Sequence, residues 1–436
     1  MGRARQLASN ENQDRILLNA SAASTDEGEH LLLDASATNT DVGFFFNTEI
    51  GTTETPPEGF VIESSLAANA VTNSKITDDA VTVSKMDSTS QSLSNRNLVK
   101  NGSMRVAQRG TSAITLSNAA VSYTLDRMHF YKANAGTQTV EQSTDAPPGF
   151  DNSLLVKNTS EDSSVTAADR VSLIYRFEGL DAAKLDFGTV NAKTVTISWY
   201  VKSTVSGKFG GALGNGSDNR SNAFLYDIFS PNQWERKSVT IAGDTAGTWV
   251  TTNARDLQIS LSMTCGSNHS GTANGAWEAA DRVSATGADT TWLETADAEW
   301  SITGLQLEIG SEATEFEHTD IAHDIQQCQR YFVKFLEGNN QEIGVGWYYS
   351  SSHASFMFQY PTTMRATPTA IDSTGSGYYT IYAAGGSDAF NSITFENGNA
   401  TNYSALNSSE VSGTAGQAGM VRATNASAKV EFLSEI

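Results

Sequence analysis

The stretch from Ser301 to Phe332 reads SITGLQLEIGSEATEFEHTDIAHDIQQCQRYF, and the chain changes character within it. Its first part alternates apolar residues with Gly, Gln and Glu, which is typical of a strand buried on one side. The apolar positions are Ile302, Leu305, Leu307 and Ile309, and Gly310 ends the run. The pattern predicts a half-buried strand that completes one hydrophobic core.

A helix start follows this strand. Thr319 and Asp320 offer side-chain oxygens that can cap the first turn of a helix. Apolar residues then recur at helical steps, at Ile321, Ile325, Cys328, Phe332 and Phe335. We therefore expect a connecting helix over 319–330, which separates a domain at 97–318 from a smaller β domain at 331–436.

Seven short blocks occur in order around this region. They are NLVKNGSMRVAQRGT at 97–111, YTLDR at 123–127, VTISWYVK at 195–202, WER at 234–236, LQLEIG at 305–310, TEFE at 314–317 and CQRY at 328–331. Together they resemble a β-sandwich domain, similar to carbohydrate-binding modules, that is common in tail fibres and other virion appendage proteins of bacteriophages. The resemblance covers about half of the chain and implies a virion setting, but a fold alone does not dictate a ligand.

The bulk composition limits the functional classes. A chain of 436 residues predicts two or three domains, and its net charge of -21 makes nucleic acid a poor partner, since phosphate binding relies on Lys and Arg. Its two cysteines are too few for a disulfide framework, and a single bridge between them stays open. No apolar run approaches the roughly 20 residues of a membrane span, and the first residues lack the apolar segment of a secretory signal.

Residues 17–46 contain a repeat with a period of fifteen, in which LLNASA at 17–22 returns as LLDASA at 32–37. Each unit joins a very short apolar run to a Gly-containing turn, so one unit can form a strand but cannot bury it alone. We expect residues 1–60 to attach the protein to a phage tail or baseplate component. The alternative interpretation is a flexible polar arm.

Residues 61–96 contain a ten-residue repeat, AVTNSKI at 70–76 against AVTVSKM at 80–86. Its apolar anchors are Val71, Ile76, Val81 and Met86, which fall five apart and fit neither a helix nor a regular strand. One such thread buries too little apolar area to offset its backbone entropy, whereas parallel copies can share a core. The repeat resembles the stalks of trimeric phage fibres and implies a homotrimer; the alternative is a disordered linker.

The rest of the chain predicts strands and lacks long helical periodicity, so we expect an all-β protein. From 97 to 318, strands at 172–177, 194–201, 234–241, 257–263 and 299–309 indicate a jelly-roll-like sandwich with loops at 134–170, 203–222 and 264–298. The Gly-rich run 210–216 is interpreted as a flexible surface loop. After the helix, strands at 344–349, 355–358, 378–382 and 428–433 predict a further β domain, with 361–368 as an edge or connecting arm.

The search for chemistry favours binding over catalysis. His318 and His323 with Asp320 and Asp324 are the densest group of metal-ligand types, but their spacing points to a helix start rather than a metal site, and we expect no cofactor. Exposed aromatic rings stack on sugar faces, so the candidate carbohydrate-binding residues are those in or beside predicted loops: Trp277, Trp292, Tyr348 and Tyr349. For each of them, packing beneath its own loop is the alternative, while Trp199 and Trp300 are expected in the core.

These observations together predict an elongated, homotrimeric tail fibre that is not an enzyme, is made in the host cytoplasm and is located in the virion tail. It would bind a host-surface glycan or protein during adsorption. Two alternatives stay open. One is a purely structural head or baseplate fibre or decoration protein, and the other is a tail-borne polysaccharide hydrolase, whose paired acids cannot be recognised from spacing.

Overall fold

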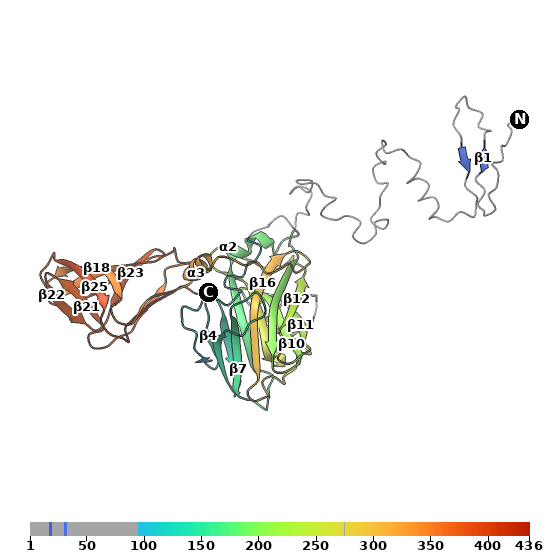
Figure 1. The fold of residues 1–436 in the computed structure, drawn as a ribbon, viewed down its shortest axis with the longest axis horizontal. Helices are drawn as coiled ribbons and strands as arrows, with labels where there is room; N and C mark the ends of the chain where they lie inside the picture. Colours follow the sequence, from blue (N-terminus) through green and yellow to red (C-terminus); the bar gives the residue numbers. More distant parts are fainter. Residues whose placement is uncertain (1–16, 20–29, 33–94, 274) are drawn as a thin grey trace, which may run out of the picture. The chain divides into compact units, whose positions relative to one another are not determined.

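A computed structural model describes residues 17–19, 30–32, 95–273 and 275–436 (Figure 1). The chain divides into two units, Met1–Thr82 and Val83–Ile436. The virion-attachment prediction for 1–60 and the stalk prediction for 61–96 fall almost wholly outside the described residues. This includes the four predicted stalk anchors Val71, Ile76, Val81 and Met86, so the trimer stays a prediction.

In the first unit, the strands β1 (Leu17–Asn19) and β2 (His30–Leu32) pair antiparallel. Leu17 lies opposite Leu32 in this register, so the first residues of the two repeat copies face each other. The repeat was expected to supply strands that need a partner, and here each of the two strands is the partner of the other.

The second unit begins with a sandwich of two six-stranded antiparallel sheets. The first sheet has the order β11 (Ser221–Ile228), β10 (Gly207–Asn215), β13 (Arg255–Cys265), β8 (Arg170–Glu178), β5 (His129–Ala133) and β4 (Ala120–Tyr123). The second has the order β12 (Glu235–Ile241), β9 (Val195–Ser203), β16 (Glu299–Ile309), β7 (Ser153–Ser160), β6 (Thr137–Ser143) and β3 (Ile114–Thr115). The chain passes repeatedly from one sheet to the other, as in jelly rolls, and the all-β prediction is confirmed.

One hydrophobic core lies between these sheets, because successive side chains of each strand point to opposite faces. Trp199 on β9 and Trp300 on β16 are both fully buried there, as predicted from their positions within strands. Short helices α2 (Gly179–Ala182) and η5 (Ala183–Leu185) follow β8 and add Leu185 to the same core.

The strand β16 is buried on both sides, so the half-buried prediction for it was wrong. Its polar side is covered by neighbouring chain segments: the Asn97 side chain donates to Leu305 O and accepts from Leu307 N, and Gln306 accepts from Glu317 N. Gly304 has a φ of 63° at a break in the register with β9. The extra residue at this break explains why the apolar positions Ile302 and Leu305 are three residues apart rather than the two of a regular strand.

Two of the predicted loops are strands. Residues 134–170 contain β6 and β7, and the Gly-rich run is part of β10, a buried strand rather than a surface loop. The glycines are required there because a Cβ on Gly210 would lie 2.0 Å from Ser284 Oγ, and one on Gly211 would lie 2.5 Å from the Phe224 ring. The loop at 264–298 is mostly irregular in its described residues, which contain the end of β13, η6 (Ser267–His269), β14 (Ser270–Gly271) and β15 (Ser284–Ala285).

The predicted connecting helix is α3 (Ile321–Gln329), and Asp320 caps it by accepting from Ala322 N at 2.8 Å. Its apolar face is less buried than the spacing suggested, because Cys328 is buried whereas Ile321 and Ile325 are exposed. Within the described segments, no helix is long and apolar enough to span a membrane.

The C-terminal domain has its own core, between two sheets. The three-stranded sheet has the order β17 (Phe332–Glu337), β26 (Lys429–Leu433) and β20 (Thr369–Asp372). The seven-stranded sheet has the order β22 (Gly386–Phe390), β21 (Tyr379–Ala383), β25 (Ala418–Ala423), β18 (Glu342–Ser350), β19 (His353–Gln359), β24 (Asn402–Asn407) and β23 (Thr394–Gly398). The proline-flanked segment 361–368 forms no strand, as expected of a connecting arm.

The packing around β10 gives a stability prediction. Gly211→Ala should lower the free energy of unfolding by roughly 1 to 3 kcal/mol, because its methyl group overlaps the Phe224 ring. Gly386→Ala is the matched control, since a Cβ there meets only Ala383 O at 3.7 Å. Urea unfolding of both variants checks this, and equal stability of the two would contradict the packing described.

Candidate functional site: the junction pocket

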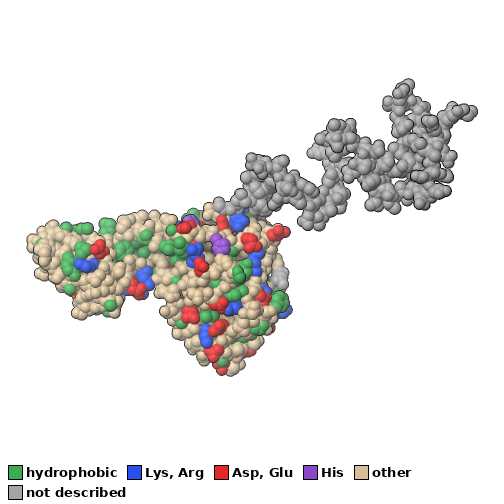
Figure 2. Space-filling model, viewed as in Figure 1, with side chains coloured by type: hydrophobic (Ala, Val, Ile, Leu, Met, Phe, Trp, Pro, Cys, Tyr) green, Lys and Arg blue, Asp and Glu red, His purple; other side chains and the backbone are tan. Residues whose placement is uncertain are grey.

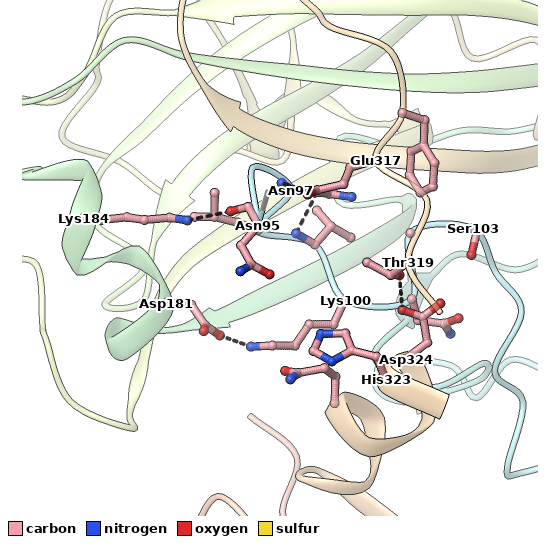
Figure 3. A pocket seen from close by; sticks show the side chains of 16 residues that line it. Asn95, Asn97, Lys100, Ser103, Asp181, Lys184, Glu317, Thr319, His323 and Asp324 are labelled. Carbon is pink, nitrogen blue, oxygen red and sulfur yellow. Dashed lines mark hydrogen bonds and ion pairs between the residues drawn. The ribbon is translucent and has the colours of Figure 1, made fainter. Parts of the chain in front are cut away.

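A polar cavity of about 390 Å³ lies where the sandwich meets α3, and we call it the junction pocket (Figure 3). Four chain segments line it: 95–103, the α2–η5 turn, 316–319 and the face of α3 that carries His323, Asp324 and Gln327. Its volume falls within the range of small-molecule sites, about 300 to 1,000 Å³.

Local hydrogen bonds fix the segment 95–103. The Asn101 side chain donates to Val106 O and Asp126 O and accepts from Val106 N, all at 2.9 Å. Asn101 itself adopts a φ of 59°, a left-handed conformation that Asn tolerates better than most residues. The wall of the pocket is therefore fixed by buried side-chain bonds rather than by a regular strand or helix.

The charged groups of the pocket are mostly paired with the protein (Figure 3). Lys100 Nζ forms an ion pair with Asp181, and Lys184 Nζ donates to Asn95 O at 3.2 Å. Glu317 accepts from Asn97 N at 2.8 Å, and Thr319 donates to Asp324. Burial lowers the pKa of Lys100, and Asp181 opposes this shift.

Other polar groups of the lining are available to a ligand. Among the described residues, the side chains of Ser103, His323 and Gln327 form no hydrogen bond, although all three line the pocket. Phe316 adds an aromatic ring, which packs against Phe150 and His318 at centroid distances of 5.1 and 4.9 Å. The pocket thus combines free hydroxyl, amide and imidazole groups with one ring, a set that suits a polyhydroxylated ligand.

A buried charge network lies beside the pocket and fixes α3. Both oxygens of Glu178 accept from Arg330, each at 2.7 Å, and Tyr331 donates to the same carboxylate. The Arg127 guanidinium lies 3.5 Å from the centroid of the Tyr331 ring and pairs with Glu435 at 2.8 Å. Burial alone would raise the pKa of Glu178, but the bonds from Arg330 and Tyr331 outweigh it and lower that pKa.

The predicted carbohydrate-binding residues do not form one site. Trp292 is only 1% exposed and Tyr348 only 3%, so these two are packed inside the fold, which was the alternative to an exposed binding ring. Trp292 packs into the sandwich core, and Tyr348 points into the C-terminal core with its hydroxyl bonded to Asp388 at 3.1 Å.

The other two candidates differ from each other. Trp277 is partly buried against Phe187 and Trp249 and donates to Ala242 O at 2.8 Å. Tyr349 is 73% exposed. Strand alternation places Trp347 on the same outer side of β18 as Tyr349. Trp347 was not among the predicted binding residues, although the two-residue period of the strand could have identified it.

The His and Asp residues around the start of α3 serve separate purposes. Asp320 caps the helix, the His318 ring packs against Phe150, and Asp324 accepts from Thr319. In the part of the chain that the structure describes, no three His, Cys, Asp or Glu residues gather as metal ligands. Cys265 and Cys328 are both free and buried, which answers the question of a bridge between them.

Comparisons with known proteins give similarity at the level of structure alone, since neither the protein-family models nor the curated proteins include a match to this sequence. One similar structure is the enzymatically active domain of tailspike protein 4 of bacteriophage CBA120, with 10% identity and a TM-score of 0.25 over 49% of this chain and 22% of that chain.

Two further structures align over nearly their whole length. A family 11 carbohydrate-binding module of a cellulosomal cellulase of Clostridium thermocellum has 12% identity and a TM-score of 0.23 over 47% of this chain and 99% of that chain. A xylan-binding domain of Paenibacillus barcinonensis has 10% identity and a TM-score of 0.21 over 47% and 98%. At such low identities and TM-scores these similarities decide neither ligand nor activity, and the all-β class rests on the sheets themselves.

The Glu178 network gives a prediction about pH. Because its folded-state pKa is lowered, Glu178 stabilises the fold above the ordinary glutamate pKa of about 4.3, and this contribution is lost as the pH falls through the lower folded value. Glu178→Gln should cost roughly 3 kcal/mol at pH 7 and should flatten the loss of stability in acid. Thermal unfolding between neutral pH and pH 3 checks this, with the exposed Glu312→Gln as control. An acid response of Glu178→Gln equal to that of the native chain would contradict it.

Proposed function

We propose that this chain is a bacteriophage tail fibre or related virion appendage that binds a host-surface glycan without cleaving it. The observation that supports this most is the junction pocket. Its free groups, on Ser103, His323 and Gln327, can exchange hydrogen bonds with sugar hydroxyls, and the Phe316 ring offers an apolar face. Its charged groups are ion-paired or hydrogen-bonded within the protein, so an uncharged ligand can enter without replacing those bonds.

The virion setting is supported by the sequence. The block 97–111, which resembles the opening of a phage appendage domain, supplies one wall of the pocket through residues 97–103. The fifteen-residue repeat in 1–60 would attach the protein to a tail or baseplate component, and the ten-residue repeat in 61–96 would join three copies. Three linked pockets raise the effective concentration of each, so weak individual contacts would be sufficient.

A hydrolase is the second candidate function, favoured by one observation on the sandwich. Sugar hydrolysis uses two carboxyl groups, one of which has a raised pKa. Burial raises the pKa of Asp281, and the negative charge of Asp218 raises it further. Release of reducing sugar by the native chain, abolished by Asp281→Asn, would establish this function in place of simple binding.

The binding proposal predicts a matched pair of variants. Gln327 lines the pocket, whereas its neighbour Gln326 is exposed and does not. At about 1 kcal/mol for one hydrogen bond lost, Gln327→Ala should weaken binding to polysaccharide extracted from the host surface roughly fivefold. Gln326→Ala should bind like the native chain, and a binding assay on immobilised polysaccharide measures both.

Each other outcome of this experiment has a definite meaning. Saturable binding that neither variant changes would show that the glycan does not bind in the junction pocket. Failure of the native chain to bind host cells or their polysaccharide would leave a purely structural fibre or decoration protein as the better description.

The attachment role predicts a separate result. Deletion of residues 1–60 should leave a protein that is made and folded but is missing from assembled particles. Electrophoresis of purified particles with detection of this chain measures it, and particles that still carry the shortened protein would contradict the role.

A further inference from the structure

The seven-stranded sheet of the C-terminal domain has one uncovered side, which we call the outer face. Its exposed large apolar side chains are Val345, Trp347 and Tyr349 on β18 and Met357 on β19, with exposed fractions of 71%, 41%, 73% and 48%. In register, Val345 lies opposite Met420 of β25. These residues form an apolar stripe across three neighbouring strands, and a large exposed apolar patch usually marks a site of interaction.

The stripe is not a consequence of a poorly formed core. Gly346 and Tyr348 alternate with it and point inward, where Phe356, Val421 and Ile381 fill the opposite side of the same sheet. A Cβ on Gly346 would lie 2.6 Å from a Val421 methyl group, so the inner side is fully packed. The packing of the domain core therefore does not require the outer apolar residues.

Charge distinguishes the outer face from the rest of the chain. The sequence has 49 Asp and Glu residues and a net charge of -21, yet none of the stripe positions or their outward-facing neighbours on β19 is acidic. Two acids lie toward its margins, Glu396 on β23 and Glu342 on β18, and Glu342 pairs in register with Arg422, whose guanidinium stacks on Tyr382 at 4.4 Å. Charged side chains are also sparse over this domain in the view of Figure 2.

This distribution indicates which partner fits. Two copies of a strongly acidic chain repel each other, so a contact between copies is favoured where acidic side chains are missing. The aliphatic residues Val345 and Met357 offer nothing to sugar hydroxyls, whereas Trp, Tyr, Met and Arg are the residues enriched in protein interfaces. A second copy of this chain therefore suits the outer face better than a glycan does.

We propose that the outer face of the seven-stranded sheet contacts a second copy of the chain in the assembled protein. This rests on the self-association within the proposed function and assigns a surface to it. The contact would bring copies together at the C-terminal domain. The junction pocket contains none of the stripe residues, so it stays available to a ligand.

Cysteine labelling of the full chain tests this contact. Val345→Cys and Val190→Cys both introduce a thiol at an exposed valine, with exposed fractions of 71% and 91% in a single chain. The native Cys265 and Cys328 are buried and contribute little background. We expect a maleimide to react with Cys at 345 at least tenfold more slowly than at 190, because a neighbouring copy covers it.

The controls separate this inference from the function on which it rests. The mass of the native chain is measured by sedimentation under the same conditions. An oligomer in which both thiols react at similar rates would overturn the assigned surface alone, and a monomer would overturn the self-association as well. The two thiols could instead react with maleimide at similar rates, with the reaction at position 345 becoming slow only when host polysaccharide is added. This result would overturn the contact between copies and would show that the outer face binds the glycan.

Discussion

The second unit depends on one buried carboxylate, that of Glu178 at the end of β8. Its side chain is 1% exposed, and a lone charge at such a position would be strongly unfavourable. Arg330 and Tyr331 pair with it from the junction between α3 and β17, so the carboxylate favours attachment of the C-terminal domain to the sandwich. The need to pair this charge therefore links two hydrophobic cores that do not share residues.

The last residues of the chain strengthen the same junction. Arg109 and Arg127 pair with Glu435, while Arg365 donates to Ser434 O and Glu435 O. Arg127 also stacks on Tyr331, so the two groups of contacts share a residue. Lys100 Nζ lies 3.4 Å from the Tyr331 hydroxyl, so the segment 95–103 contacts the same junction just after α3, beside the pocket.

The fold class was predictable from the sequence, because strand periodicity and β-branched residues are local signals. Glu299–Ile309 was identified with its observed bounds, and Trp199 and Trp300 were assigned correctly to the core. The strand β10 was missed because its glycines are explained only by the distant residues Ser284 and Phe224. Likewise Trp292 lies in an irregular segment, where nothing local shows that it turns into the core.

The pocket could not be predicted for a related reason. Its free groups, on Ser103, His323 and Gln327, come from segments more than two hundred residues apart, and none belongs to a spaced motif. A signal did exist on α3, where His323 and Gln327 share a face distinct from that of Ile321 and Ile325. From the sequence alone, however, this polar face cannot be distinguished from an ordinary helix surface that faces solvent.

Under the proposed function, affinity and assembly would be physically connected. Three or four neutral hydrogen bonds at about 1 kcal/mol each, with one ring contact, would give a single pocket a dissociation constant on the order of 1 mM for the proposed glycan. Such a contact releases within a short time and cannot hold a particle on a cell by itself. Linked copies change this, because rebinding occurs at the effective concentration set by the assembly rather than by the solution. The apolar outer face and the polar pocket would then have complementary roles: the first makes the copies act together, and only then is the weak chemistry of the second sufficient for attachment.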